Sequence, residues 1–318
     1  WDEHFQIYYL TEKMRSQDAE FSKISDKVRK GTCDSEVQKF MEKCVKSCPN
    51  ESNNEKYALG KLAIIVTTNA EKETINIDKL NELLPLEKEF RVFSKDESTN
   101  VKNAPKLFDK MPLTKTGQLE TQCIFRKGAP VMVTSNHQQM KYRNNGIVNG
   151  SRGYIDSIQV SKEDPNEPEI IWVVFPDEKT GKLLREDNKA LLKAHKPNNP
   201  MAVPIRKQRK TFSMQGNANW LREQFPLTLC YAITSYKSQG QTLEEVIIDF
   251  AHKGARIDTG SFYTAMSRVR NGKDLYLRGF SSNYIKAYEL VEEKLNAMKI
   301  SAPYNFKKIQ LDFSVFED

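Results

Sequence analysis

The chain has 318 residues, which is enough for one large domain or two domains of medium size. Hydrophobic residues make up 38% and charged residues 29%, so the composition argues against a disordered or fibrous protein and favours a globular one. The net charge of +7 mildly favours a polyanionic partner. No apolar run is long enough to span a bilayer, so we expect no membrane partner.

The first two predicted elements are amphipathic helices. Asp18 can cap the first helix, and Gly31 can end it. The second begins at Asp34 or Ser35 and repeats apolar residues at helical spacing as far as Cys48.

A strand and a third amphipathic helix follow a polar loop over residues 49–56. The run Leu62–Val66 has the length and composition of a buried strand, and it leads through Thr67-Thr68-Asn69 into a helix that reaches Leu84. Alternation of helices and buried strands predicts an α/β fold with a parallel sheet.

The middle of the chain changes to short strand-like runs separated by turns. The runs are 123–125, 130–133, 153–160 and 170–175, and the turns are 144–146, 149–150 and 179–181. Such strands, without a long helical pattern, predict a small antiparallel barrel inserted into the α/β fold.

The closing stretch returns to α/β character. We expect strands at 228–233, 246–250 and 274–277, and a helix over 261–270. The predicted organisation is one discontinuous α/β domain formed by 1–120 and 216–318, with the barrel at 121–215 inserted.

Cysteine and histidine usage says little in favour of metal or hydrolase chemistry. The five cysteines are odd in number and include no CxxC pair, which argues against a disulfide framework or a zinc site and favours a reducing compartment. We therefore predict no metal ligands in this chain and an intracellular protein, nuclear if the source is a eukaryote.

The sequence opens at Trp1 without an initiator methionine or a signal peptide, so we expect it to be part of a longer protein.

Five motifs in one order carry a family resemblance. They are Leu10–Asp18 (LTEKMRSQD), Gly128–Asn136 (GAPVMVTSN), Val148–Gly153 (VNGSRG), Ala232–Leu243 (AITSYKSQGQTL) and Phe262–Arg270 (FYTAMSRVR). Together they resemble the second half of the RecD/Pif-type DNA helicases of superfamily 1, which include the helicase part of Helitron transposon proteins. The resemblance extends from Trp1 to about Phe280. It implies a RecA-like parallel sheet with helices on both faces, and an SH3-type fold for the inserted barrel.

The resemblance assigns two catalytic arginines, Arg15 and Arg268, which would reach across a cleft to stabilise charge on the γ-phosphate of ATP. A guanidinium suits this role because it is always charged and presents a fixed fork of donors. The competing interpretation makes each an ordinary surface arginine. The resemblance also places Gly240 and Gln241 against the nucleotide.

The remaining candidate residues are expected to bind single-stranded DNA. They are Thr67, Thr68, Asn69, Asn136, Asn149, Thr234, Ser235, Tyr236, Lys237 and Ser238. Many relatives have His where this chain has Tyr236, so a tyrosine here could stack on a base instead of bonding a phosphate. Two alternatives stay open: the Thr-Thr-Asn run could only cap a helix, and the loop from Thr234 could only serve turn geometry.

The sequence lacks the GxxxxGK[ST] loop that holds the phosphates of ATP. We therefore expect ATP and Mg²⁺ to be bound chiefly by an N-terminal RecA-like domain of the same parent chain, which would be this chain's partner. The predicted function is the C-terminal motor half of an ATP-dependent 5′-to-3′ DNA helicase, inactive as an ATPase alone. The alternatives are a stand-alone nucleic-acid-binding module and an adaptor that uses the barrel. The basic run Arg206–Lys210 is either a DNA contact or a solvated face.

Overall fold

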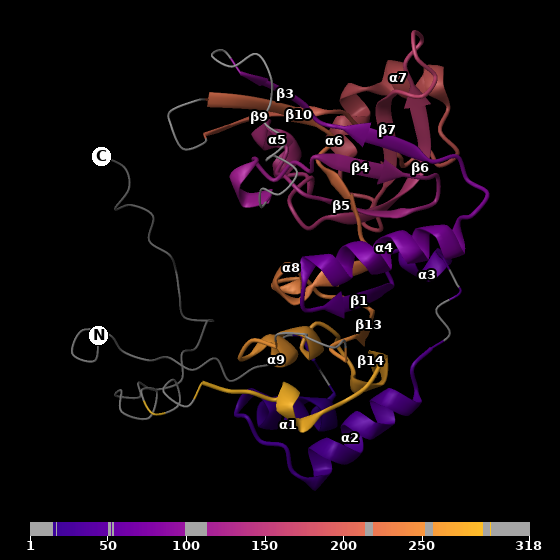
Figure 1. The fold of residues 1–318 in the computed structure, drawn as a ribbon. Helices are drawn as coiled ribbons and strands as arrows, with labels where there is room; N and C mark the ends of the chain where they lie inside the picture. Colours follow the sequence, from indigo (N-terminus) through magenta and orange to yellow (C-terminus); the bar gives the residue numbers. More distant parts are fainter. Residues whose placement is uncertain are drawn as a thin grey trace, which may run out of the picture.

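The structure is a computed structural model. It describes residues 15–16, 18–49, 52, 54–98, 113–213, 219–251, 257–288 and 293. A parallel sheet occupies the lower part of the molecule in Figure 1, and antiparallel sheets occupy the upper part. Of the first motif, Leu10–Met14 and Gln17 lie outside the described residues. Within the described residues, no helix is both long and apolar enough to cross a membrane.

The parallel sheet has four strands in the order β12-β1-β13-β14. They are β12 (Ala232–Thr234), β1 (Leu62–Val66), β13 (Glu245–Ile248) and β14 (Leu275–Leu277). All three pairings are parallel. The sheet therefore unites the first and last thirds of the chain, as the sequence predicts.

Both faces of this sheet are buried, as is usual for parallel strands. Along β1, Leu62, Ile64 and Val66 belong to one core, and Ala63 and Ile65 to the other. Three helices cover the second core: α1 (Ala19–Arg29), α2 (Ser35–Lys46) and α9 (Ser261–Met266). Helices α3 (Asn54–Ala58) and α4 (Asn69–Leu83) contribute Tyr57 and Leu80 to the first.

The predicted caps of the first two helices are confirmed. The Asp18 carboxylate accepts a hydrogen bond from the Phe21 backbone N–H at 2.9 Å, and Asp34 accepts from Val37 at 3.0 Å. Asp18 also accepts from the backbone N–H of Gly272 at 3.0 Å. These backbone hydrogen bonds lower the pKa of Asp18, and the bond from Phe21 has the largest effect. The cap therefore also fastens α1 to the segment just before β14.

The antiparallel strands form three sheets. One has the order β11 (Leu227–Leu229), β5 (Pro130–Val133), β6 (Arg152–Val160), β7 (Pro168–Val174) and β8 (Val203–Ile205). Another pairs β3 (Lys95–Ser98), β10 (Asn219–Gln224) and β9 (Gln208–Ser213), and the smallest pairs β2 (Phe90–Phe93) with β4 (Gln122–Phe125). Strands β2, β3, β10 and β11 lie outside 121–215, so antiparallel pairing reaches beyond both predicted boundaries. Those boundaries and the SH3-type barrel stay predictions.

The prediction of one strand over 228–233 is wrong. Leu227–Leu229 pairs with β5, whereas Ala232–Thr234 pairs with β1, so the chain passes from one sheet to the other at Cys230 and Tyr231. Arg152 braces this crossing. Its buried guanidinium donates to the carbonyl oxygens of Leu62 at 3.2 Å and Cys230 at 3.3 Å.

Short helices also interrupt stretches that the sequence assigns to strands and loops. They are α5 (Met140–Arg143), α6 (Lys182–Asp187), α7 (Lys189–His195) and α8 (Ser235–Ser238), and the 3-10 turns are Leu113–Lys115, Gly272–Asp274 and Ser282–Tyr284. Helix α3 begins inside the predicted loop 49–56, and α9 ends four residues before the predicted end at Arg270. Most of these helices are too short to show helical periodicity in a sequence.

Candidate functional site

Two predicted DNA-binding loops leave adjacent strands at the same edge of the parallel sheet. Val66 at the end of β1 pairs with Thr234 at the end of β12. The Thr67-Thr68-Asn69 run and helix α8 therefore start side by side. Ligands of open parallel sheets bind at the carboxyl ends of the strands, which is where both loops lie.

The loop after β12 is shaped by a short cap and a glycine. Thr234 Oγ1 accepts from the backbone N–H of Lys237 at 3.4 Å and so begins α8. Gly240 has a φ of +81°, a left-handed backbone conformation that is strained for residues with a side chain. The reason for glycine here is this conformation and not lack of space, since an added Cβ would meet no atom within 4 Å. The glycine turns the chain so that the backbone N–H of Gln241 donates to Ser238 O at 3.0 Å.

The two predicted arginines converge on this loop and on Ser267. Arg15 Nε donates to Thr242 Oγ1 at 3.2 Å, and its Nη1 donates to Ser267 O at 2.9 Å. Arg268 Nη2 donates to Ser267 Oγ at 2.6 Å. Residues more than 250 positions apart, together with the predicted nucleotide contacts Gly240 and Gln241, thus share one location.

Arg268 is largely buried, with 8% of its surface exposed. Besides Ser267 it donates to Thr264 O at 2.6 Å, and its Nη1 lies 3.4 Å from Gln241 O and 3.5 Å from Ser238 O. Burial lowers the pKa of Arg268, and the positive charge of Arg15 lowers it further. Among the described residues, no carboxylate forms an ion pair with either guanidinium. Within the part of the chain that the structure describes, the pair is therefore a concentrated positive charge without a carboxylate partner, and Arg268 also holds its own surroundings through its hydrogen bonds.

Gln241 links this location to the antiparallel part of the molecule. Its Nε2 donates to Lys237 O at 2.7 Å and lies 3.9 Å from the sulfur of Met132 on β5. A Cβ on Gly150 would lie 3.4 Å from the same Nε2 atom. The side chain therefore spans α8, β5 and the turn before β6.

Three of the predicted DNA-binding residues form one exposed cluster. Asn136 Oδ1 accepts from the backbone N–H of Asn149 at 2.8 Å, and Lys237 Nζ donates to Asn149 Oδ1 at 3.2 Å. Burial lowers the pKa of Lys237, and the nearby charge of Lys72 lowers it further. The cluster offers amide groups and cations to an anionic strand.

The other residues of α8 differ in what they expose. The side chains of Ser235 and Ser238 are buried, and Ser238 Oγ donates to Ser235 O at 2.7 Å. Tyr236 is 65% exposed, and its hydroxyl donates to Asp258 Oδ2 at 2.6 Å. Most of the Tyr236 side chain is thus on the surface beside α8.

Thr67, Thr68 and Asn69 stand at the start of α4. Thr68 and Glu71 form a capping box: Thr68 Oγ1 accepts from the Glu71 N–H at 3.2 Å, and Glu71 Oε2 accepts from the Thr68 N–H at 2.9 Å. Thr67 Oγ1 donates to the same carboxylate oxygen at 3.0 Å. Helix capping therefore engages both threonine side chains in this structure.

Two charged residues near Lys237, Lys72 and Glu120, were not predicted from the sequence. Lys72, in the first turn of α4, is 9% exposed. Glu120 has a pKa raised chiefly by burial and opposed by the charge of Lys72. Only the position of Lys72, four residues after the end of the Thr-Thr pair, could have suggested it. Nothing in the sequence marks Glu120.

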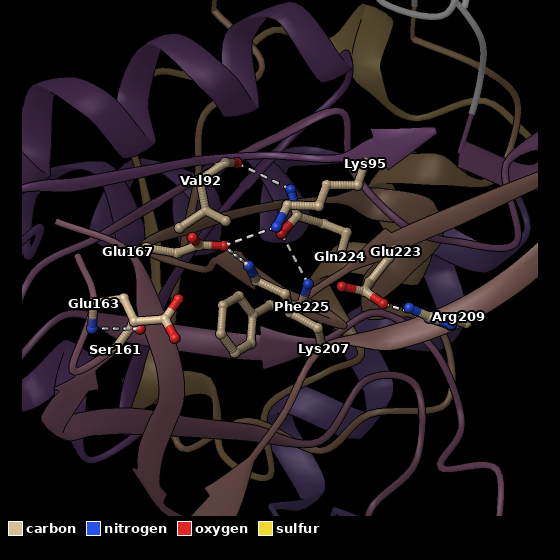
Figure 2. A network of polar contacts seen from close by, with 10 residues as sticks. All are labelled: Val92, Lys95, Ser161, Glu163, Glu167, Lys207, Arg209, Glu223, Gln224 and Phe225. Atoms are coloured by element: carbon tan, nitrogen blue, oxygen red, sulfur yellow. Dashed lines mark hydrogen bonds and ion pairs between the residues drawn. The ribbon is translucent and has the colours of Figure 1, made fainter. Parts of the chain in front are cut away.

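The basic run Arg206–Lys210 is largely neutralised (Figure 2). Lys207 Nζ lies 2.9 Å from Glu167, which also binds Lys95 at 3.1 Å. Arg209 pairs with Glu223 in the same view. Arg206 lies 3.4 Å from Glu169. These pairs favour the solvated-face interpretation over a direct DNA contact.

The described residues contain no group of three or more metal-ligating side chains. We therefore assign no Mg²⁺ ligand to them. The unpaired guanidinium charge of Arg15 and Arg268 fits the phosphates of a nucleotide.

Comparisons with known proteins show which helicases this chain is similar to. No family model matches the chain. It is 25% identical over 289 residues to the ATP-dependent DNA helicase Pif1 of Bdellovibrio bacteriovorus, covering 88% of this chain and 52% of that protein. It is 24% identical over 290 residues to the ATP-dependent DNA helicase PIF1 of Xenopus laevis, covering 91% and 38%. The chain is related to the Pif1-type helicases. It spans about half or less of the length of these relatives.

Solved structures of Pif1 helicases share the fold. The Candida albicans Pif1 helicase superposes with a TM-score of 0.63 at 20% identity, covering 90% of this chain and 59% of that one. A Bacteroides Pif1 in complex with ADP-AlF3 and ssDNA gives a TM-score of 0.59 at 21% identity, covering 92% and 56%. The parallel sheet with its helices thus matches the RecA-like fold of the Pif1 helicases.

Proposed function

We propose that this chain is the C-terminal motor half of an ATP-dependent 5′-to-3′ DNA helicase. In this proposal Arg15 and Arg268 complete an ATP site whose phosphate-binding loop, Mg²⁺ ligands and remaining residues come from an N-terminal RecA-like domain of the same parent chain. The antiparallel part corresponds to an SH3-type barrel that contributes Asn136 and Asn149 to a single-stranded DNA site.

The observation that carries the proposal is the convergence of Arg15 and Arg268 on Ser267. Two guanidinium groups repel each other, so holding them together costs free energy unless an anion joins them. Their hydrogen bonds within the chain go to neutral carbonyl and hydroxyl oxygens, which leave the positive charge in place. Phosphate oxygens of a nucleotide would neutralise it with bidentate, charge-assisted hydrogen bonds. ATP would supply the energy of phosphoryl transfer, and the arginines would stabilise the developing charge.

A second argument connects the arginines to DNA through one short loop. Residues 238–242 contact both arginines, and Lys237 directly before them contacts Asn149. A movement of this loop on nucleotide binding would therefore change the position of the Asn136, Asn149 and Lys237 cluster. Such a shared element is what coupling between two sites requires.

The two alternatives explain less. A stand-alone nucleic-acid-binding module accounts for Lys237 and the asparagines but gives no reason for the paired arginines. An adaptor barrel needs an exposed aromatic groove, whereas Trp172 and Phe175 are buried and only Tyr154 of the three predicted core aromatics is partly exposed.

Strand displacement by the longer protein that contains this chain tests the proposal. Forked substrates with only a 5′ or only a 3′ single-stranded tail, each with and without ATP, separate the directions of travel. We expect ATP-dependent unwinding of the 5′-tailed substrate. Tight DNA binding with neither ATP turnover nor unwinding would support the stand-alone module instead.

A further inference from the structure

A polar cavity of about 740 Å³ lies beside α8 and the start of α9. Its lining residues come from α8, the start of α9 and the segment after β14: Ser235, Tyr236, Gln239, Ile257, Asp258, Thr259, Gly260, Ser261, Thr264, Lys286 and Tyr288. The volume is within the range of small-ligand sites. Arg268 Nε donates to the carbonyl oxygen of Thr264, a lining residue, at 2.6 Å, so the cavity borders the site of the paired arginines.

Two exposed tyrosines line this cavity. Tyr236 is 65% exposed and Tyr288 is 63% exposed, which makes them two of the few large apolar side chains on the described surface. Exposed aromatic rings in nucleic-acid-binding proteins are platforms on which unstacked bases lie. The remaining lining is mostly hydroxyl, amide and charged groups, which suit a flat polar ligand.

Charge at the cavity argues against a phosphate there. The Asp258 carboxylate lies at its edge and accepts the Tyr236 hydroxyl at 2.6 Å. Lys286 Nζ donates to Ile257 O at 3.2 Å. A carboxylate repels phosphate but accepts hydrogen bonds from the amino groups of bases.

The rim of the cavity is held by backbone hydrogen bonds. The Gly260 N–H donates to Lys286 O at 3.0 Å, and the Ser261 N–H donates to Asp258 O at 3.0 Å. The first of these connects the segment that carries Asp258 to the segment that carries Tyr288. The backbones of these two segments are therefore held together at the rim of the cavity.

We propose that this cavity takes one unstacked base of the single strand that passes along α8, and that it prefers a base with an exocyclic amino group, such as cytosine, over thymine. Tyr236 and Tyr288 supply stacking surfaces, and Asp258 accepts the amino group. The inference rests on the proposed binding of single-stranded DNA and adds a base preference to it. Ser235 and Tyr236 belong both to the predicted backbone-binding loop and to the cavity wall, so a nucleotide bound to the loop has its base within reach.

Competition anisotropy with the 318-residue chain tests this preference. The probes are a labelled oligo-dT and unlabelled competitors of equal length, one all dT and one with dC at every third position. We expect the dC-containing strand to bind about fivefold or more tightly, from one amino-group hydrogen bond to a carboxylate. Asp258→Ala should remove the difference between the two strands.

Ring substitutions form the second arm. Tyr288→Ala should weaken binding of both strands about fivefold or more through lost stacking. Tyr288→Phe retains the ring and should bind more tightly than Tyr288→Ala. The controls are Phe93→Ala, which removes an equally exposed aromatic ring outside the cavity, and Glu163→Gln, which removes an exposed carboxylate elsewhere. Both controls should keep the affinity and the preference.

The outcomes separate this inference from the proposed function. A chain that binds neither strand contradicts the proposed DNA site itself. A chain that binds both strands equally, or an Asp258→Ala variant that keeps the preference, contradicts the base cavity alone. If Asp258→Ala tightens binding of both strands to the same degree, the cavity borders a phosphate and the inference is wrong.

Discussion

Arg15 and Arg268 bind the same residue through different atoms. Arg15 donates to the backbone carbonyl of Ser267 at 2.9 Å, and Arg268 donates to its hydroxyl at 2.6 Å. Arg15 remains partly exposed, whereas Arg268 is 8% exposed. The two arginines therefore differ in how much of the local structure depends on them, and this difference allows their proposed catalytic role to be tested separately from a structural one.

Arg268→Ala should affect both turnover and stability. In the longer enzyme we expect kcat to fall by roughly 10³-fold, with a far smaller change in the KM for ATP, because the arginine would act mainly in the transition state. Arg268→Lys should recover little, since an ammonium lacks the fork. Arg268→Ala also removes the guanidinium that donates to the carbonyl oxygens of Thr264 and Gln241. Its loss should lower the melting temperature of the chain by several degrees.

Arg15→Ala separates the two effects. Its two hydrogen bonds are partly exposed, so its loss should change the melting temperature little while still lowering kcat substantially. Thermal melts and ATP turnover measured on both variants decide the matter. If kcat falls only in the variant whose melting temperature falls, the arginines hold the structure together and do not stabilise the phosphate.

The 318-residue chain alone should not turn over ATP, because its sequence contains no phosphate-binding loop. Phosphate release is measured with saturating single-stranded DNA, and the longer enzyme serves as the positive control. Turnover above about one per second, the low end for enzymes, would contradict the assignment to the second motor half.

Binding of single-stranded DNA should be weak and sensitive to salt. Half of a DNA channel neutralises few phosphates, so log affinity should fall with log salt at a slope of roughly −2 to −4. Lys237→Ala should weaken binding and reduce that slope by about one. Arg206→Ala is the matched control, because Arg206 is paired with Glu169, and it should leave the slope unchanged. Equal effects of both substitutions would return the basic run to the DNA site.

The charge of Asp18 should stabilise the fold only above acidic pH. Its pKa is lowered from 3.8 in the folded chain, so the stabilisation is present above that value and is lost as the pH falls through the folded pKa. Asp18→Asn keeps a good cap and removes the charge, and should cost about 0.5–1 kcal/mol of unfolding free energy at pH 7. Denaturant melts at pH 7 and at a pH below the folded pKa of Asp18 should show the difference vanish in acid, and Glu163→Gln should show no such change.

Local patterns were enough to predict much of the fold. Asp18 and Asp34 cap helices because their carboxylates bond to N–H groups two or three residues away, and this information lies within a few positions of sequence. The strand Leu62–Val66 is recognisable from its run of apolar residues. The split of 228–233 was not predictable, because both halves are apolar and the break depends on which distant strand each one pairs with.

Some residues of the candidate site could be predicted from the sequence and others could not. The meeting of Arg15 with Arg268 followed from the family resemblance and from no local pattern, since the two residues lie at opposite ends of the chain. Asp258 and Glu120 were missed because a single acidic residue in a loop carries no periodic signal. Their environment is created by folding: Asp258 receives the Tyr236 hydroxyl, and Glu120 acquires its raised pKa through burial.

Thr68 allows a decision between helix capping and DNA binding. The capping box predicts that Thr68→Ala lowers the unfolding free energy by about 1 kcal/mol, because one N–H at the start of α4 loses its acceptor. Thr68→Asp should retain part of the stability: aspartate can accept the Glu71 N–H as threonine does, but it loses the hydrogen bond from Thr68 Oγ1 to Glu71 Oε2 at 2.9 Å and places a second negative charge beside that carboxylate. The same substitution places a negative charge beside the end of β12, where the predicted DNA loop begins.

If the strand's phosphates lie against Thr67 and Thr68, Thr68→Asp should weaken binding of oligo-dT about tenfold or more at low salt, with a smaller loss at high salt. If capping is the only role, Thr68→Asp should bind DNA as the unaltered chain does, and Thr68→Ala should show a stability loss alone. Denaturant melts and anisotropy titrations on both variants distinguish the two cases. An aspartate variant that is stable and binds normally would remove Thr67, Thr68 and Asn69 from the proposed DNA site.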